Sequence, residues 1–131
     1  MVTSAPQHAH ERGGAGTKQA HPFYGEMDGI GVRRNQARVH GWWTTDDATL
    51  KTHKATLTLE LQYLFPDGWK TVNTGTRSIK PNQTGKRATA SAPCSTDALG
   101  KWRSVLDVDI NWMVDDSRKT VSSVQIRTCR P

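Results

Sequence analysis

Alternating apolar and polar residues mark the two longest expected strands. In residues 55–65, Ala, three Leu, Tyr and Phe occupy the odd positions, and Thr, Thr, Glu and Gln occupy the even positions before Leu64. Residues 101–114 repeat the pattern, with Trp102 and Trp112 near the two ends of one apolar face. A period of two predicts a strand with one buried face and argues against a helix. We therefore expect both apolar faces, including both tryptophans, in the core.

Shorter strands are expected around these two. They lie at 28–33, 37–44, 69–74, 77–80, 87–94 and 120–128. The segment 87–94 places alanines on one face, which suits a place where two sheets approach closely or where large aromatics lie opposite. In the last strand, Val124 and Ile126 are expected to point inward. No run repeats at helical spacing, so we predict an all-β, Ig-like β-sandwich of about seven to eight antiparallel strands.

The first 27 residues have a different composition. They are rich in Gly, Ala, His and Gln and carry few large apolar side chains, so residues 1–27 are predicted to form a flexible N-terminal tail. This leaves 28–131 as the β-sandwich domain. One cluster, His21-Pro22-Phe23-Tyr24, is unusual for a solvated linker. These residues either dock on the domain itself or bind another protein, and we take them as candidate partner-binding residues.

Two cysteines, Cys94 and Cys129, each close an expected strand. In a chain with only 34% hydrophobic residues, they predict one disulfide and hence an oxidising compartment. The bond would close a loop of about 35 residues and stabilise the fold by roughly 3–4 kcal/mol. Because Cys129 is out of phase with Val124 and Ile126, either a bulge turns it inward or the bond lies at the margin of the sandwich. We favour the margin.

Net charge and the lack of long apolar segments bear on the partner and on the compartment of the protein. The formal net charge of +6 permits an acidic partner, although the basic residues form no single block. No stretch approaches the roughly 20 apolar residues of a membrane span. The first residues lack the apolar region of a signal peptide, so we expect the mature form of a secreted, extracellular protein.

The sequence offers little catalytic or metal chemistry. Asp107 and Asp109 share one strand face, as paired carboxylates of a glycosidase could, but alternate polar residues are ordinary on a solvated face. The five histidines lack the spacing of a zinc site, and no phosphate-binding glycine loop or nucleophile motif is present. We therefore expect a protein that is not an enzyme and holds no metal or cofactor.

Trp42 and Trp43 are consecutive, so in a strand their rings point to opposite faces. An exposed tryptophan on a sandwich could hold a sugar ring or anchor another protein. Alternatively, the outward ring is covered by the N-terminal segment, by Phe23 or Tyr24. We take Trp42 and Trp43 as further candidate partner-binding residues.

Several segments carry a family resemblance. They are Gly41-Trp-Trp, Lys54-Ala-Thr-Leu-Thr-Leu-Glu-Leu-Gln, Arg87-Ala-Thr-Ala, Lys101-Trp-Arg-Ser-Val-Leu-Asp-Val-Asp-Ile and Cys129-Arg. Through them, residues 37–131 resemble a family of small secreted proteins of streptomycetes and related actinobacteria. Members of that family often have an additional cysteine pair, which this chain lacks.

The chain is also similar to the small adaptor subunits of the umbrella-shaped antibacterial toxin particles of streptomycetes. The resemblance implies a protein that links a lectin-bearing, protease-like subunit to the stalk of a large toxin. It further implies that an N-terminal extension enters a cleft of the lectin-bearing subunit.

Together these observations predict a secreted, non-enzymatic protein–protein adaptor whose partners are a lectin-bearing subunit and a large toxin. Two alternatives stay open: a carbohydrate-binding module that uses an exposed Trp42 or Trp43, and a secreted protease inhibitor. Nucleic acid is not expected as a partner, because the basic residues are not interleaved with aromatics on one strand face.

Overall fold

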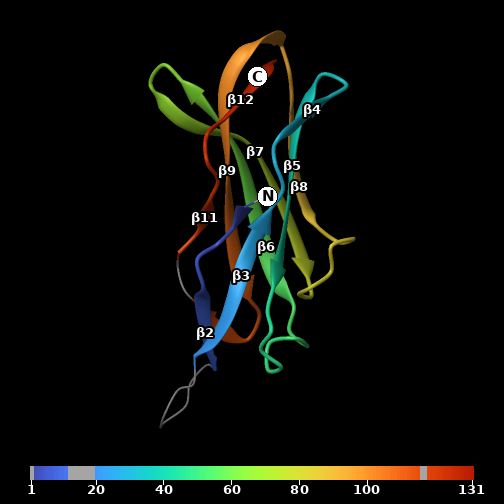
Figure 1. Ribbon diagram of the computed structural model, residues 1–131, viewed down its shortest axis with the longest axis vertical. Helices are drawn as coiled ribbons and strands as arrows, with labels where there is room; N and C mark the ends of the chain where they lie inside the picture. Colours follow the sequence, from blue (N-terminus) through green and yellow to red (C-terminus); the bar gives the residue numbers. More distant parts are fainter. Residues whose placement is uncertain (1, 12–19, 116–117) are drawn as a thin grey trace.

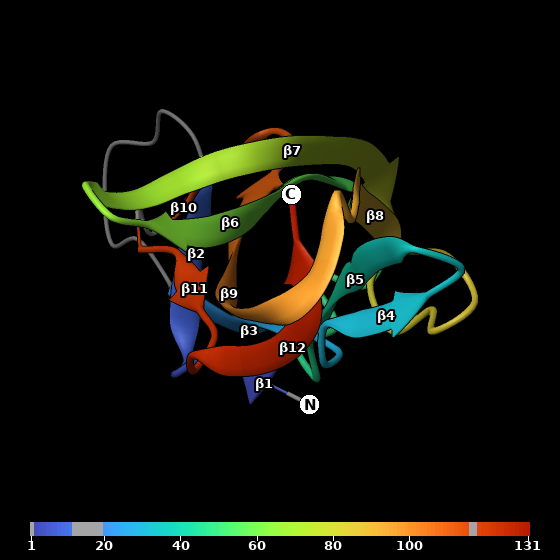
Figure 2. The ribbon, with the colours of Figure 1, turned by 90° about the horizontal axis from the view of Figure 1, so that it is seen from above.

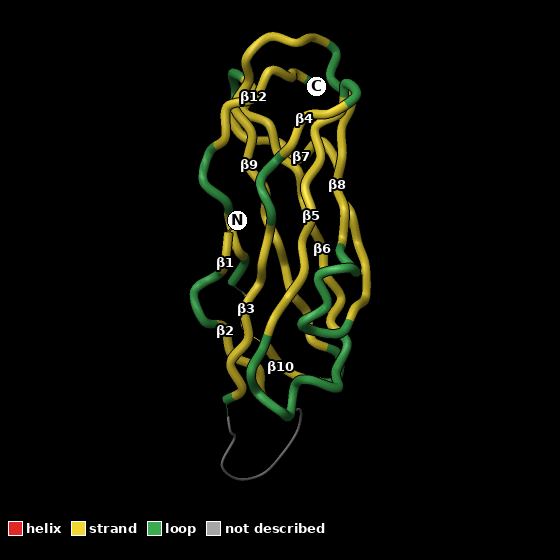
Figure 3. Tube along the Cα trace, turned by 45° about the vertical axis from the view of Figure 1, so that its right-hand side comes forward, coloured by secondary structure: helices red, strands yellow, loops and turns green. Residues whose placement is uncertain are grey.

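Two antiparallel sheets packed face to face make up the structure, a computed structural model that describes residues 2–11, 20–115 and 118–131 (Figure 1). The described residues form twelve strands and no helix (Figure 3). The all-β sandwich predicted from the sequence is therefore confirmed. The strand count exceeds the expected seven to eight, because the N-terminal region contributes three strands and several connections contain short ones.

The first sheet has seven strands. In spatial order they are β10 (Met113–Asp115), β2 (Gln7–Glu11), β3 (His21–Met27), β5 (Gln36–Thr44) and β4 (Gly31–Arg33), with β1 (Val2–Thr3) beside β3 and β8 (Ala88–Pro93) beside β5. The second sheet has five strands. They are β11 (Thr120–Val121), β9 (Thr96–Ile110), β6 (Ala55–Phe65) and β7 (Gly68–Ile79), with β12 (Gln125–Arg130) also beside β9.

The two layers face each other when the molecule is seen from above (Figure 2). On one side, β12 lies beside the start of β4, where Arg127 Nε donates to the Ile30 carbonyl oxygen at 2.6 Å and Gln125 Oε1 accepts from Ile30 N at 2.8 Å. The C-terminus lies at the same end as β4, opposite the end that carries β10 and the tip of β2 (Figure 3). Polar side chains thus close this side of the sandwich without continuing either sheet.

The core lies between the layers and follows the predicted alternation. The odd residues of β6 from Ala55 to Tyr63 are buried, and the even ones are half-buried. In β9, Trp102, Leu106, Val108 and Ile110 are buried on the inner face. The hairpin turn before Gly68 is also present, and Gly68 adopts a φ of 123°.

A close approach between β7 and β8 explains the small residues of β8. Ala88, Ala90 and Ala92 are all buried. At Gly75 of β7, an added Cβ would lie 1.8 Å from the backbone oxygen of Thr89. The backbones therefore meet where no side chain fits, which confirms the close approach of the two sheets predicted from the alanines.

The N-terminal region is part of the sandwich, which corrects the predicted flexible tail over 1–27 and the domain start at residue 28. β3 pairs with β1 and β2 on one edge and with β5 on the other. Phe23 and Met27 are fully buried. The burial alternates along β3 as it does along β6, so this segment is a central strand of the first sheet. Residues 1 and 12–19 of the predicted tail lie outside the described residues.

The predicted strand over 101–114 ends at Ile110, where Asn111 and Trp112 form a turn that leads into β10. Trp112, expected in the core, is 81% exposed, and Val114 is also exposed. Trp112 has a φ of 68°, which takes its side chain off the face shared by Trp102 and Ile110.

The phase of the last strand is opposite to the prediction. Val124 and Ile126 are exposed, whereas Cys129 is fully buried and Gln125 and Arg127 are half-buried. Gln125 pairs with the inward-facing Trp102, and paired residues of antiparallel strands share a face. The two β-branched residues therefore lie on the outer face of the second sheet.

Candidate functional site

The candidate residues His21 to Tyr24 lie in β3 and not on a mobile segment. Phe23 packs edge-on against Trp43, with 6.3 Å between the ring centroids. The Pro22 carbonyl oxygen accepts a hydrogen bond from Thr45 Oγ1 at 2.8 Å. Tyr24 is half-buried on the opposite face from Phe23. The cluster therefore docks on the domain itself, which was one of the two alternatives.

His21 connects three segments at one end of the first sheet. Its Nε2 lies 2.7 Å from Glu11 Oε1 of β2, and its Nδ1 lies 3.0 Å from Asp47 Oδ2 of the loop after β5. Ionised carboxylates only accept hydrogen bonds, so this geometry favours the protonated imidazole, in which both ring nitrogens donate. The hydrogen bond that His21 Nδ1 donates to Asp47 is the main cause that raises the pKa of His21. The pKa of Asp47 is lowered, chiefly by His21.

Trp42 and Trp43 are both buried, which rules them out as the exposed sugar platform considered above. Trp43 is fully buried, and its Nε1 donates to the Ile79 carbonyl oxygen at 3.0 Å. Trp42 is 6% exposed, and the guanidinium of Arg87 lies over its ring at 5.3 Å from the centroid. Phe23 contacts Trp43, the inward ring, while Arg87 covers the outward one.

The predicted disulfide is present between Cys94 and Cys129. It joins the end of β8 in the first sheet to β12 in the second. Cys129 is fully buried, and its carbonyl oxygen accepts a hydrogen bond from Trp102 Nε1 at 2.9 Å. Cys129 reaches the interior because the odd residues of β12 face inward. The bond therefore cross-links the two layers, at the point where β8 ends. The marginal position was argued from an inward assignment of Val124 and Ile126, and that assignment is wrong.

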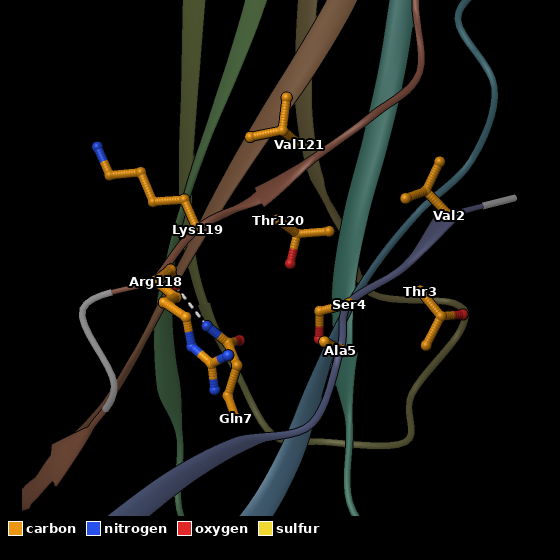
Figure 4. A pocket seen from close by; sticks show the side chains of 9 residues that line it. All are labelled: Val2, Thr3, Ser4, Ala5, Gln7, Arg118, Lys119, Thr120 and Val121. Carbon is orange, nitrogen blue, oxygen red and sulfur yellow. Dashed lines mark hydrogen bonds between the residues drawn. The ribbon is translucent and has the colours of Figure 1, made fainter.

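The N-terminal segment before β2 also contacts the residues directly before β11. Arg118 donates to the Pro6 carbonyl oxygen at 3.0 Å, and Gln7 Nε2 donates to the Arg118 carbonyl oxygen. A cavity of about 170 Å³ lies between these segments (Figure 4). The hydroxyl of Thr120 points into it, and neither Thr120 Oγ1 nor Gln7 Oε1 has a hydrogen-bond partner among the described residues. The two hydrogen bonds of Arg118 hold the segment before β2 next to the start of β11.

The outer face of the second sheet carries the largest group of exposed apolar side chains. The described residues include seven large hydrophobic side chains with high exposure, and four of them lie here. We call this surface the β9–β12 face and define it by Leu99, Val121, Val124 and Ile126. Their exposed fractions run from 50% to 61%.

Strand register places Leu99, Val121 and Ile126 on one face, and Val124 directly precedes β12. Ile126 pairs with Lys101, Thr128 pairs with Leu99, and Val121 pairs with Val105. Because directly paired residues share a face, Leu99 and Ile126 are diagonal neighbours on the outer surface. Val124 and Val121 continue the row along the same edge of the sheet. The sequence analysis missed this surface because it assigned Val124 and Ile126 to the core.

Basic side chains border this surface. Lys101 and Arg130 are exposed, and Arg130 Nε donates to the Leu99 carbonyl oxygen at 2.8 Å. Arg103 stacks over the ring of Trp69 on the same face, 4.5 Å from the ring centroid. Further along β9 lie the carboxyl groups of Asp107 and Asp109, and burial raises the pKa of Asp107. The apolar part of the face is thus flanked by cations.

Comparisons with known proteins assign the chain to no family. A scan against protein-family models found no match, and neither did searches for similar curated proteins and similar solved structures. Within the described residues, no group of three or more His, Cys, Asp or Glu side chains is placed to hold a metal ion. No helix long and apolar enough to cross a membrane occurs in the same part of the chain.

Proposed function

We propose that the chain is a non-enzymatic protein–protein adaptor that docks a partner on the β9–β12 face. The observation that carries the proposal is the grouping of Leu99, Val121 and Ile126 on adjoining strands, with Val124 in the connection directly before β12. Single exposed hydrophobic residues are common, but a contiguous group is typical of a protein-binding surface. Burying such a group against a partner gains the same hydrophobic free energy that drives folding.

Charge complementarity indicates the kind of partner. Lys101 and Arg130 flank the apolar group, and Arg103 lies beside it. The whole chain carries a formal net charge of +6. A partner surface with an apolar centre and an acidic rim would therefore fit, since opposite charges at a rim accelerate association and select orientation.

The resemblance to the toxin-particle adaptors suggests which partners to test: the lectin-bearing subunit and the large toxin. The disulfide is compatible with an extracellular protein, and secretion is part of the proposal. The route of contact differs from the one expected from sequence. His21 to Tyr24 support the core of the first sheet, so the proposed contact lies on the outer face of the second sheet.

The test is affinity capture from the culture supernatant of the organism that produces the protein, followed by mass spectrometry. The bait is the full chain, compared with Ile126→Glu and Val124→Glu variants. Both side chains are more than half exposed, so both variants should fold. We expect each to lower the affinity for the captured partner at least about tenfold, as loss of an interface hot spot does.

Val114→Glu is the matched control, because Val114 is similarly exposed but lies in β10 of the other sheet. It should leave the affinity unchanged. Equal capture by the wild type and by both face variants would refute the proposal.

A further inference from the structure

One end of the second sheet carries two adjoining cavities with a shared wall. They lie where β6 begins and where β7 and β9 end, at the lower end of the molecule in Figure 1. Their volumes are about 330 and 390 Å³. Lys54 and Lys80 line both, so the two hollows form one continuous surface. None of the residues of the β9–β12 face lines either of them.

This surface has a strong excess of positive charge. Arg77 and Lys86 join Lys54 and Lys80 around the first cavity, and all four side chains are exposed. No carboxylate of the described residues lines either cavity, and none of the four cations is in an ion pair with a described residue. A hollow lined by one sign of charge concentrates ions of the opposite sign. The local repulsion among these cations would fall when an anion binds.

Trp112 adds an aromatic platform to the second cavity. The ring is 81% exposed, although tryptophan is the largest apolar side chain in proteins. Its φ of 68° lies in the left-handed region, which bulky residues rarely adopt and glycine or asparagine adopts more readily. Neither packing nor the requirements of the turn explain a tryptophan at this position. Such a combination of strain and exposure is characteristic of binding sites.

The turn that carries Trp112 is fixed to the sheet. His53 Nδ1 donates to the Asn111 carbonyl oxygen at 3.0 Å, and Asn111 N donates to the Lys54 carbonyl oxygen at 2.9 Å. These two bonds fix the backbone of the turn, and thus the Cα of Trp112, beside Lys54. The turn is therefore in place before any ligand arrives, and binding has to order only the side chain of Trp112.

We propose that this end of the sandwich binds an anionic polysaccharide. The apolar face of a sugar ring packs on the indole of Trp112, which removes apolar surface from water. Phosphate, sulfate or carboxylate groups of the polymer pair with Lys54 and Lys80, and with Arg77 and Lys86 further along the surface. A glycan fits better than single-stranded nucleic acid, because nucleic-acid channels stack successive bases on several aromatics and only Trp112 is exposed here.

The experiment measures binding of fluorescein-labelled dextran sulfate to the full chain by fluorescence anisotropy, with neutral dextran of the same length as the comparison. Trp112→Gly removes the ring and suits the positive φ, so it should fold. The double variant Lys54→Gln/Lys80→Gln removes the shared cations. We expect saturable binding of dextran sulfate only. Each variant should weaken it by at least about tenfold, the ratio that corresponds to 1.4 kcal/mol.

A double variant with the same loss of charge elsewhere, Arg33→Gln/Arg34→Gln, controls for net charge, because both side chains are exposed and line neither cavity. It should change the affinity less than about twofold, as expected for positions outside the contact. Bound dextran sulfate should also protect Trp112 from iodide quenching. Equal losses in the control and the site variants would show nonspecific attraction and overturn the proposal. Tighter binding of an oligothymidylate that depends on Trp112 would overturn it in favour of nucleic acid, and the absence of dextran sulfate binding would overturn it outright.

Discussion

At the scale of single residues, His21 and Trp112 lie where their polarity alone would not place them: the histidine is buried and the tryptophan is exposed. His21 occupies an inward position of β3. Burying a charged side chain there is unfavourable unless it is paired, and Glu11 and Asp47 provide that pairing. Trp112 is the reverse, an apolar ring held in solvent by a turn with positive φ. Neither placement follows from side-chain polarity alone.

The ionic cluster predicts how stability depends on pH. A raised pKa means that the contribution of His21 is complete below its unfolded value near 6.5 and is lost as the pH rises through its folded pKa. The lowered pKa values of Glu11 and Asp47 mean that their contributions are complete above about 4.5 and 3.8, and are lost as the pH falls. The cluster should therefore stabilise the fold most between about pH 4.5 and 6.5.

Urea unfolding of the wild type and of His21→Asn across pH 4 to 9 tests this, with pH values chosen to span the ordinary pKa values of Glu and His. The difference in the free energy of unfolding should be largest in the acidic window and should shrink toward the alkaline limit. A difference that is constant with pH would mean that His21 acts by packing and not by charge.

At the scale of elements, the predictability of a strand depended on what occupies its inner face. β6 and most of β9 were predicted correctly because leucines, valines and a tryptophan fill alternate positions. β3 was missed because His21 and Gly25 take inward positions next to Phe23 and Met27, so the alternation is hidden. In β12 the inward positions are taken by the polar residues Gln125 and Arg127, which form hydrogen bonds with the backbone of Ile30. The sequence analysis therefore assigned the wrong face of this strand to the core.

The contact between β7 and β8 predicts a severe effect of one methyl group. Gly75→Ala would place a Cβ against the backbone of Thr89, which cannot rotate away. We expect destabilisation of about 1–3 kcal/mol or more, as for an overpacked core. Gly31→Ala is the matched control, because a Cβ at Gly31 meets nothing within 4 Å. Its effect should stay within about 0.5 kcal/mol. Urea unfolding measures both, and equal stabilities would contradict the close approach.

The disulfide predicts a second loss of stability at this scale. Cys94 and Cys129 are 35 residues apart, so removal of the bond frees a loop of that length in the unfolded chain. The variant Cys94→Ser/Cys129→Ser should be less stable by about 3–4 kcal/mol. Thermal unfolding of the variant beside the oxidised wild type checks this. An unchanged melting temperature would show that the disulfide does not contribute to the stability of the fold.

At the scale of the whole molecule, the N-terminal region is a structural part of the sandwich. Deletion of residues 1–27 would remove β1, β2 and β3 and expose Trp43, which packs against Phe23. We expect the truncated chain to lose cooperative unfolding and dispersed amide resonances. A well-folded truncated domain would instead support the tail that the composition suggested.

The two proposed surfaces lie on different parts of the second sheet: the β9–β12 face beside the C-terminal strand and the cationic end around Lys54 and Trp112. An adaptor uses separate surfaces for separate partners, so the two proposals are independent and compatible. The sequence could suggest neither location. Ile126 and Val124 resemble core residues, and the cations at 54, 77, 80 and 86 become neighbours only when β6 and β7 form their hairpin.

The most direct test of the adaptor proposal is amide hydrogen exchange of the full chain, free and bound to its captured partner. We predict that binding slows exchange in the segments that form the β9–β12 face, 97–103 and 119–128, and leaves β5 and β8 unchanged. Protection confined to the first sheet, with none on the β9–β12 face, would contradict the account.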